Sequence, residues 1–445
     1  MAGNWTTQNK VLPGVYFRFR STQQNGVTVG NRGTIAICKP LSWGPVAEIM
    51  TIEAGQDPTP FVGGGITSDN AQFLREMFKG TNRTAGASKV LLYRPPASSS
   101  AEASVTVGNL TATAQYPGAK GNDISIIVTE EADDSFTVTT VVDGDVVDEQ
   151  IGITDAGDLS ENAWVAFTGE GTLTATVGSA LVGGLDGTVS DSAFATFLTK
   201  IEPYNFDVLC YDGSSATVIT AFRTFIIAQN EDNGIYCQLV LANAPSAPDS
   251  RYVVNVVSDV VMDDGDELSA VEVTWWAAGA LAGASYNESL TNATYPGAVG
   301  TTRLTASQYV AALNAGKFVL AEDNGRVYVV QDVNTLTTYT PDISEVYRYN
   351  KTVRLCNTIA NDLAAEFSRN YLGIVNNNAQ GRSMFKAAIV GYLLDIEGNE
   401  GIQDFDPNDV TVEQGQSINA ILITIVVRPV GTAEKIYVTI TMEVD

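Results

Sequence analysis

The sequence predicts a multidomain protein in which an antiparallel β domain is followed by a parallel α/β domain and a final α+β domain. Three observations support this fold class. The chain has 445 residues, which is more than a single hydrophobic core commonly holds. Residues 105–187 alternate with period two and are rich in Thr, Val, Gly and Asp, as antiparallel strands are. From about residue 190, apolar runs alternate with helical segments, which indicates parallel strands joined by helices.

The first hundred residues contain several predicted strands and one helix. Residues 11–20 (VLPGVYFRFR) alternate with period two, so they predict a strand. One of its faces carries Val15, Phe17 and Phe19, and the other carries Tyr16, Arg18 and Arg20. GTIAICK at 33–39 and SKVLLYRP at 88–95 predict further strands. SDNAQFLREMFKG at 68–80 begins with a capping residue and ends on Gly80, which predicts a helix.

The antiparallel β domain is predicted to follow PPASSSAEAS at 95–104, where the composition changes sharply. Its many turn residues and short alternating runs indicate a sandwich of two sheets. Within it, SFTVTTVVDGDVVDE at 135–149 predicts a hairpin that turns at Asp143-Gly144, because this pair is common in tight hairpin turns.

The parallel α/β domain is predicted from residue 188 to residue 343. Its expected strands are FDVLCY (206–211), IYCQLVLA (235–242), YVVNVVSD (252–259) and RVYVVQDVNTLT (326–337). Its expected helices are SDSAFATFLTKIEP (190–203), SATVITAFRTFIIAQNEDNG (215–234), TWWAAGALAGAS (274–285) and ASQYVAALNAGK (306–317). The strands are almost entirely apolar, as strands covered on both faces are.

The C-terminal segment, residues 344–445, is predicted to contain two helices and two strands. The helices are residues 350–373 and 380–397, and the strands are INAILITIVVRP (418–429) and EKIYVTITMEVD (434–445). In the last strand, Ile436, Val438 and Ile440 share one face, and the alternation continues to the final residue. A strand pattern at a chain end implies that the end is docked, either on the chain's own sheet or on that of another chain.

The charge distribution disfavours a nucleic-acid partner. The chain has 25 basic and 51 acidic residues, a net charge of −26, whereas nucleic-acid binding needs a basic face. The segment 1–47 has no acidic residue, and the segment 122–212 has 18 acidic residues and a single basic one. A basic end on an acidic body favours contact with another acidic surface, for instance that of a second copy, although chance clustering explains the same pattern.

No constellation of catalytic or metal-binding residues is found. The chain has no histidine, so a Ser-His-Asp triad, Cys-His catalysis and a Cys/His zinc site are excluded. The four cysteines, Cys38, Cys210, Cys237 and Cys356, lie in apolar runs and are expected to be buried free thiols. The acidic runs at 262–267 and 404–409 lack the EF-hand spacing, so solvated turns are favoured over calcium sites. We expect neither catalytic residues nor a cofactor nor a metal. No signal-peptide h-region and no apolar run long enough to span a bilayer are found.

The motif YPGA occurs twice, in QYPGAKG at 115–121 and TYPGAVG at 294–300. Both are predicted to be type II turns, because Pro and Gly suit their central positions. The flanking segments differ, strands after the first and a small-residue helix before the second, so we interpret the pair as one kind of turn used twice and not as an internal repeat.

Taken together, stretches along nearly the whole chain resemble the contractile tail sheath proteins of bacteriophages and related phage-tail-like particles. These are LPGVYFRF (12–19), ATAQYPGAKGNDISIIV (112–128), WWAAGALAGASYNESLTNATYPGAVG (275–300), VQDVNTLTTYT (330–340), FSRNYLGIVNNNAQGRSMFKAAIVGYL (367–393) and VRPVGTAEKIYVTITMEV (427–444). Their order along the chain makes the resemblance specific, although no single stretch is decisive.

The resemblance implies a domain plan. It comprises an N-terminal arm (1–32), an α/β segment that packs with the core (33–96), a β-sandwich domain (97–187), a subtilisin-like α/β domain (188–343) and a C-terminal α+β domain (344–445) with a C-terminal arm (432–445). Without histidine, the subtilisin-like domain would be a scaffold and not a protease.

The resemblance also implies a function without catalysis. The chain would be a sheath subunit that forms stacked hexameric rings around an inner tube and contracts to drive that tube through a cell envelope. Its partners would be other copies of itself, the inner tube protein, and baseplate and tail terminator proteins, with no nucleic acid and no insertion into a membrane. It would be made in the cytoplasm of the host bacterium and lie in a virion or a phage-tail-like particle.

We expect the two arms to add as strands beside Ala420–Val427 of other subunits. The donor residues are Val15, Tyr16, Phe17, Arg18, Phe19, Arg20, Ile436, Tyr437, Val438, Thr439, Ile440 and Glu443, and the acceptor residues are Ile421, Ile423, Ile425 and Val427. Arg18 and Arg20 would face Glu443 or Asp445, each pair contributing roughly 0.2–1 kcal/mol.

Two other classes of protein remain as alternatives. A hydrolase would use Asp, Glu or Lys chemistry in the α/β domain, but no recognisable site supports it. A surface-layer protein or adhesin would use the acidic, Thr-rich β segments outside the cell, and its expected mark is an export signal. The sequence does not distinguish a phage from a headless, bacteriocin-like particle.

Overall fold

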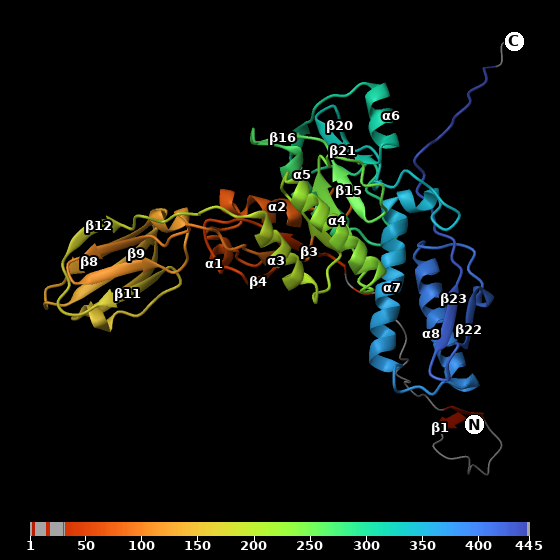
Figure 1. The fold of residues 1–445 in the computed structure, drawn as a ribbon, viewed down its shortest axis with the longest axis horizontal. Helices are drawn as coiled ribbons and strands as arrows, with labels where there is room; N and C mark the ends of the chain where they lie inside the picture. Colours follow the sequence, from red (N-terminus) through yellow and green to blue (C-terminus); the bar gives the residue numbers. More distant parts are fainter. Residues whose placement is uncertain (1, 5–14, 18–29, 31, 443–445) are drawn as a thin grey trace. The chain divides into compact units, whose positions relative to one another are not determined.

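The computed structural model of the chain describes residues 2–4, 15–17, 30 and 32–442 (Figure 1). The chain folds into two compact units. The larger unit consists of Gly30–Asn361 together with Gly431–Asp445. The smaller unit consists of Asp362–Val430 together with the described residues of the N-terminal segment. The chain therefore leaves the larger unit, forms the smaller one, and returns to the larger unit at its C-terminal end.

A seven-stranded sheet forms the centre of the larger unit, in the order β19-β15-β14-β13-β3-β5-β4. Its strands are β3 (Thr34–Cys38), β4 (Ile49–Glu53), β5 (Lys89–Tyr93), β13 (Val208–Cys210), β14 (Gln238–Ala242), β15 (Val253–Val256) and β19 (Lys317–Phe318). All neighbours are parallel except β4, which runs antiparallel at one edge. The parallel α/β fold expected from the alternating pattern is thus confirmed.

Helices cover both faces of this sheet, as Figure 1 shows. On one face, α2 (Gln72–Lys79) and α5 (Ala270–Gly283) pack over a core that includes Ile35 and Ile37. On the other face, α3 (Asp191–Ile201) and α4 (Ala216–Glu231) pack over Ala36. Because side chains alternate along β3, neighbouring residues serve two separate cores, which explains why the strand is apolar at nearly every position.

Smaller elements complete the α/β part of the larger unit. Helix α1 (Thr59–Val62) precedes α2, and α6 (Ala306–Asn314) separates the strands of two small sheets along the chain. One of these joins β16 (Val260–Met262), β17 (Glu267–Leu268) and β18 (Ala298–Gly300), and the other pairs β20 (Leu320–Asp323) with β21 (Arg326–Val329). The segment 326–337 was expected as a strand of the main sheet. Instead, its strand β21 forms an antiparallel hairpin with β20, because the two are joined by a tight turn.

The predicted β sandwich is present within the larger unit. One sheet has the order β10-β9-β8-β12 and the other β11-β7-β6. The strands are β6 (Ser104–Val107), β7 (Leu110–Ala114), β8 (Ile124–Glu130), β9 (Phe136–Val142), β10 (Asp145–Ile153), β11 (Val165–Gly169) and β12 (Thr176–Ala180). Val142 pairs with Asp145, which confirms the hairpin at Asp143-Gly144.

Trp43 joins the sandwich to the α/β part of the larger unit. It comes from the loop after β3, yet it lies in the sandwich core, 1 % exposed, with its ring centre 4.7 Å from that of Trp164. Arg94 supports the same junction, because its guanidinium donates hydrogen bonds to the carbonyl oxygens of Gly44 (2.6 Å) and Pro117 (2.5 Å). The loop after β3 is therefore a structural part of both folds.

The two YPGA motifs differ in conformation. At the second motif, Ala298 N–H donates to the Tyr295 carbonyl oxygen at 3.2 Å and Gly297 has φ 80°, as in a type II turn. The type II turn predicted at the first motif is wrong, because Gly118 has φ 142° and ψ 162°. There the N–H of Ala119 donates to the Asp186 carboxylate instead of closing a turn. The motif therefore adapts to its surroundings, and the interpretation that it marks no repeat stands.

Gly118 is expected to tolerate no side chain. A Cβ added there would lie 2.0 Å from the Ser42 carbonyl oxygen, and its φ of 142° disfavours every other residue. We expect Gly118→Ala to lower the free energy of unfolding by about 3 kcal/mol or more, because strain and overlap add. Gly297→Ala is the matched control; its nearest neighbour would be the flexible Met262 side chain at 3.3 Å, and its expected loss is about 1 kcal/mol. Urea unfolding followed by tryptophan fluorescence measures both losses, and equal values would contradict the prediction.

The smaller unit combines helices with a β hairpin. Helix α7 (Asn350–Asn370) begins in the larger unit and continues into the smaller one, where α8 (Ala379–Gly398) follows. Phe367, Tyr371 and Phe385 form an aromatic cluster between these helices. Strands β22 (Val410–Gln414) and β23 (Ile421–Ile425) form an antiparallel pair. At the N-terminus, β1 (Ala2–Asn4) pairs in parallel with β2 (Val15–Phe17).

The strand predicted at 434–445 is not formed over its described part, residues 434–442. Its described part, residues 434–442, has no secondary structure and no strand partner, and Figure 1 shows it as a coil that leads to the C-terminus. A strand needs a neighbour to satisfy its backbone hydrogen bonds, so a period-two pattern alone does not fix one. In the described part of the chain, residues 434–442 thus pair with none of the sheets.

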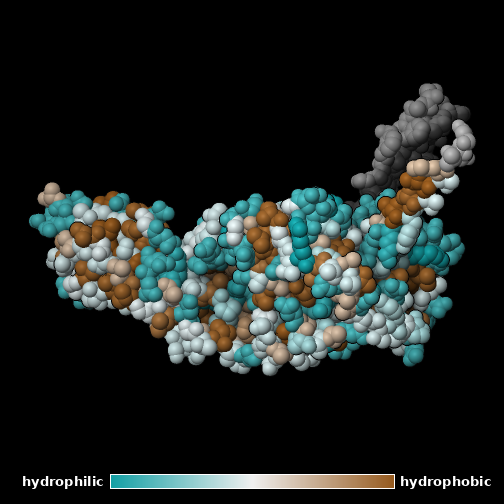
Figure 2. Space-filling model, turned by 90° about the horizontal axis from the view of Figure 1, so that it is seen from above, coloured by the Kyte–Doolittle hydropathy of each residue, from teal (hydrophilic) through white to brown (hydrophobic). Residues whose placement is uncertain are grey.

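No helix in the described part of the chain is long and apolar enough to cross a membrane. On the face drawn in Figure 2, hydrophobic residues lie scattered among hydrophilic ones and do not merge into one large patch. Exposed apolar side chains of this kind are common on protein surfaces and need no special explanation.

Candidate assembly surfaces

The carboxyl ends of β3 and β13 meet at the point where the strand order of the sheet reverses, the usual ligand site of such folds. Here Lys39 and Asp212 form an ion pair of 2.5 Å, and Trp275 Nε1 donates to the same carboxylate at 2.8 Å. The Lys39 ammonium also lies 4.5 Å from the centre of the Trp275 ring. The charge of the Asp212 carboxylate is thus balanced by Lys39, and the carboxylate is 4 % exposed. It holds Lys39 and Trp275 together and is not open to a ligand.

The four cysteines are free, as the sequence predicted, and Cys356 is only partly buried while the other three are buried. Burial raises the pKa of each thiol, most strongly at Cys38, Cys210 and Cys237. They therefore stay protonated at neutral pH and lack the thiolate that nucleophilic attack requires.

The two acidic runs serve local structure. Asp264 accepts a hydrogen bond from the N–H of Asp266. Asp406 accepts one from the N–H of Asn408, and Asp409 forms an ion pair of 3.3 Å with Arg428. Among the described residues, no group of three or more acidic or cysteine side chains is arranged to hold a metal ion.

Strand β23 has one open edge. Within the described chain it pairs with β22 alone, in a register that places Ile423 opposite Val412. The N–H of Gly415 donates to the Ala420 carbonyl, and the N–H of Val426 donates to the Asp409 carbonyl. The pairs 415/420 and 409/426 are therefore hydrogen-bonded pairs of this ladder. Because hydrogen-bonded and non-bonded pairs alternate in an antiparallel ladder, the backbone groups at 421, 423 and 425 point away from β22.

These positions coincide with the expected acceptor residues. Ile421, Ile423 and Ile425 lie in β23, and Val427 follows shortly after it; all are half-buried, while Leu422 and Val426 between them are exposed. The structure therefore brings the acceptor residues together along one edge, with free backbone donors and acceptors and partly covered apolar side chains. Such an edge is a template for a further strand.

The C-terminal arm presents the complementary features. Ile436, Tyr437, Val438 and Ile440 are 75–90 % exposed, and Thr439 is exposed as well. Glu443 lies outside the described residues, as do Arg18, Phe19 and Arg20 of the N-terminal strand. Val15, Tyr16 and Phe17 pair through their backbones with β1, a partner that the sequence analysis did not foresee.

The start of the C-terminal arm is fixed on the larger unit by Glu434. Its carboxylate accepts a hydrogen bond from Thr291 Oγ1 at 2.8 Å and another from Gln331 Nε2 at 2.5 Å. The sequence does not mark this residue as functional, because a single glutamate before a strand pattern carries no signal. Its partners are 143 and 103 residues away in the chain.

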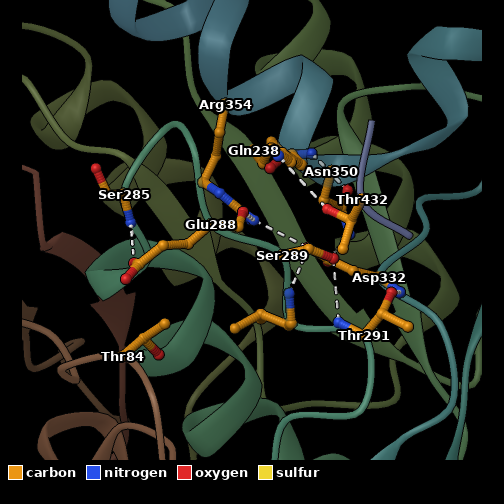
Figure 3. A network of polar contacts seen from close by, with 12 residues as sticks. Thr84, Gln238, Ser285, Glu288, Ser289, Thr291, Asp332, Asn350, Arg354 and Thr432 are labelled. Carbon is orange, nitrogen blue, oxygen red and sulfur yellow. Dashed lines mark hydrogen bonds and ion pairs between the residues drawn. The ribbon is translucent and has the colours of Figure 1, made fainter. Parts of the chain in front are cut away.

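A buried ion pair lies beside these partners. Asp332 and Arg354 are 2.9 Å apart and at most 1 % exposed. Asp332 also accepts hydrogen bonds from the N–H of Leu290 (3.0 Å) and from Asn350 Nδ2 (2.9 Å), and Asn350 in turn accepts one from Gln238 (Figure 3). The network joins the end of β21, the loop after α5, strand β14 and the first turn of α7.

Four family models match consecutive parts of the chain. Residues 32–94 match the N-terminal region of domain III of the tail sheath protein Gp18, and residues 97–186 match the β-sandwich domain of phage tail sheath proteins. Residues 187–335 match the central domain of the phage tail sheath protein, and residues 342–443 match the phage tail sheath C-terminal domain.

Solved structures agree with these matches. A sheath tail protein of Desulfitobacterium hafniense is 37 % identical, with a TM-score of 0.86 over 97 % of this chain and 100 % of that one. A sheath tail protein of Listeria innocua is 30 % identical, with a TM-score of 0.76 over 93 % and 96 % of the two chains.

A relative known from its sequence points the same way. The phage-like element PBSX protein XkdK of Bacillus subtilis (strain 168) is 33 % identical over 98 % of both chains. The resemblance seen in the six stretches is thereby confirmed. The chain belongs to the phage tail sheath protein family, whose members are structural proteins and not enzymes.

Proposed function

We propose that this chain is the subunit of a contractile tail sheath and that its arms link each subunit to its neighbours by strand exchange. The observation that carries the proposal is the match between the open edge of β23 and the exposed, alternating arm at 436–442. Strand β23 offers unpaired backbone groups along its open edge, and the arm offers a strand sequence without a partner. The two are therefore complementary.

In the proposed assembly, subunits form hexameric rings that stack around an inner tube, and contraction drives the tube through a cell envelope. The other partners are baseplate and tail terminator proteins, and the particle is a phage or a phage-tail-like device made in the bacterial cytoplasm. The central α/β domain would act as a scaffold; its subtilisin-like character stays a prediction. The N-terminal strand at Val15–Arg20 would add beside the same acceptor in a further subunit.

Purified protein examined by negative-stain electron microscopy over a range of concentrations tests the proposal. Rings, or tubes of uniform width, are the expected result. If a soluble chain forms neither, alone or with the inner tube protein added, the proposal fails.

A proline on the open edge tests the acceptor strand directly. Ile423→Pro removes an N–H that points away from β22, so it should spare the existing hairpin and abolish assembly, because proline cannot donate to an added strand. Ile423→Ala is the matched control: it keeps the N–H and should still assemble, at a higher concentration. The measurement is the protein concentration at which half of the subunits pellet with tubes. Tubes formed by a folded Ile423→Pro variant would exclude β23 as the acceptor.

A further inference from the structure

We propose that Glu434 is the anchor of the C-terminal arm and sets the point at which the arm becomes free to leave its own subunit. This inference rests on the proposed strand exchange, which says that the arm leaves but not from where. Glu434 is a positioning residue in this proposal, because it acts by holding the arm that reaches the neighbouring subunit.

The contacts of the arm change abruptly at Glu434. Before it, the chain is held at short intervals: Val430 N–H donates to the Gly401 carbonyl at 3.1 Å, and the Thr432 hydroxyl accepts from Lys351 Nζ at 3.5 Å. At Glu434 both carboxylate oxygens are used. Beyond it, the described residues 435–442 make no hydrogen bond or ion pair and their large apolar side chains are 75–90 % exposed. Glu434 is thus the last fixed position in the described part of the arm.

The anchor is attached to a rigid part of the molecule. Thr291 Oγ1, which donates to Glu434, also accepts from the N–H of Asp332 at 2.9 Å, and Gln331 is the residue before Asp332. Asp332 is held by the buried ion pair with Arg354. Thr291 and Gln331, the two donors to Glu434, are therefore held in place by the buried network. Only the arm itself is free to move when the contact opens.

The anchor controls the reach of the arm. With Glu434 bound, the free segment begins at Lys435. When the contact opens, residues 433 and 434 join the free segment, because the Thr432 hydroxyl still accepts from Lys351 Nζ. They add roughly 7 Å, at about 3.3 Å per extended residue. An assembly whose subunits shift while their arms stay paired needs such reserve length. A bound anchor also restricts the space that the arm explores, which raises its effective concentration at a nearby acceptor.

A charge swap tests the anchor without relying on assembly. Gln331→Glu places a second carboxylate against Glu434, so the contact should open. Adding Glu434→Gln should close it again, because the new amide at position 434 can donate to the new carboxylate at position 331 while its carbonyl oxygen accepts from Thr291. The double variant has the same net charge as the original chain. Both variants keep the buried pair of Asp332 and Arg354.

Trypsin cleavage after Lys435 in dilute, unassembled protein reports the state of the anchor. We expect cleavage to be about tenfold faster in Gln331→Glu, the effect of losing a charge-assisted hydrogen bond, and to return to the original rate in the double variant. Peptides spanning 428–442 with Glu or Gln at position 434 correct for the preference of trypsin. The proposal that Glu434 anchors the arm is wrong if Gln331→Glu is cleaved no faster than the original chain. It is also wrong if the double variant is cleaved as fast as Gln331→Glu.

The same variants connect the anchor to assembly. The concentration for half-maximal tube formation should rise several-fold in Gln331→Glu and return in the double variant, because a longer free arm finds its acceptor less often. If the concentration for half-maximal tube formation is unchanged in Gln331→Glu, the anchor does not control the reach of the arm. If the original chain never assembles, the proposed function fails, whereas the trypsin experiment still decides whether Glu434 anchors the arm.

Discussion

A chain truncated after Glu434 is expected to fold as the full chain does and to form no tubes. The large apolar side chains described beyond this point are exposed, and residues 435–442 make no hydrogen bond or ion pair, so their loss removes little that stabilises the single subunit. It removes the whole exposed strand pattern that the open edge of β23 is proposed to accept. Thermal unfolding and circular dichroism test the first part, and electron microscopy at concentrations where the full chain assembles tests the second.

Truncation after Met442 is the matched control. It removes the last three residues and keeps Ile436, Val438 and Ile440, so tubes should still form. Deletion of residues 1–20 should, like loss of the C-terminal arm, leave a folded protein that does not assemble. Tubes of normal width from a chain that ends at Glu434 would show that this arm does not hold the assembly together.

Replacing Arg354 by Met is expected to lower the free energy of unfolding of the larger unit by about 3–5 kcal/mol. The substitution keeps most of the length of the side chain but leaves the Asp332 carboxylate buried, 1 % exposed, without its cation. The hydrogen bonds from Leu290 and Asn350 remain and should keep the loss toward the lower end of this range. Four of the five tryptophans, Trp43, Trp164, Trp275 and Trp276, belong to the larger unit, so urea unfolding followed by tryptophan fluorescence reports mainly on this unit.

The double variant Arg354→Met, Asp332→Asn provides the control for buried charge. The amide introduced at position 332 can still accept one of the two remaining hydrogen bonds and carries no charge, so the double variant should be more stable than Arg354→Met alone. This non-additivity is the sign of a direct interaction between the two positions. The interpretation is wrong if Arg354→Met costs less than about 1 kcal/mol, a value typical of exposed ion pairs, or if Asp332→Asn restores nothing.

Most helices and the sandwich hairpin could be predicted because their signals are local. The hairpin at Asp143-Gly144 needs only a turn pair between alternating runs, and α7 and α8 need only their helical periodicity. The start of α5 was predicted four residues late, although Ser269 and Glu272 form a capping box that the sequence displays. Strand β4 was missed, since IMTIE is short and its position at an edge is decided by pairing with β5.

The candidate surfaces likewise combine features that are visible in the sequence with features that only the tertiary structure creates. The alternation of Ile421, Ile423 and Ile425 is visible in the sequence, but which backbone groups point outward depends on the register with β22, a tertiary property. The C-terminal arm shows the reverse case, because the strong strand pattern of its described part forms no strand in the single chain. Glu434 could not be found from sequence, because its role is created by Thr291 and Gln331, which the fold brings to it.

The separation of donor and acceptor within one chain has a consequence for the size of the assembly. An arm that leaves one subunit and an edge that accepts the arm of another form a head-to-tail contact, in which two different surfaces meet. Such a contact does not stop at a dimer, because every added subunit brings a new acceptor edge with it. Where the rotation between neighbours closes a hexameric ring, growth around that ring ends, but along the stack of rings the subunit contains no stop signal for growth. The length of the finished polymer must then be imposed from outside the subunit, by a template or by a cap that occupies the last open edge.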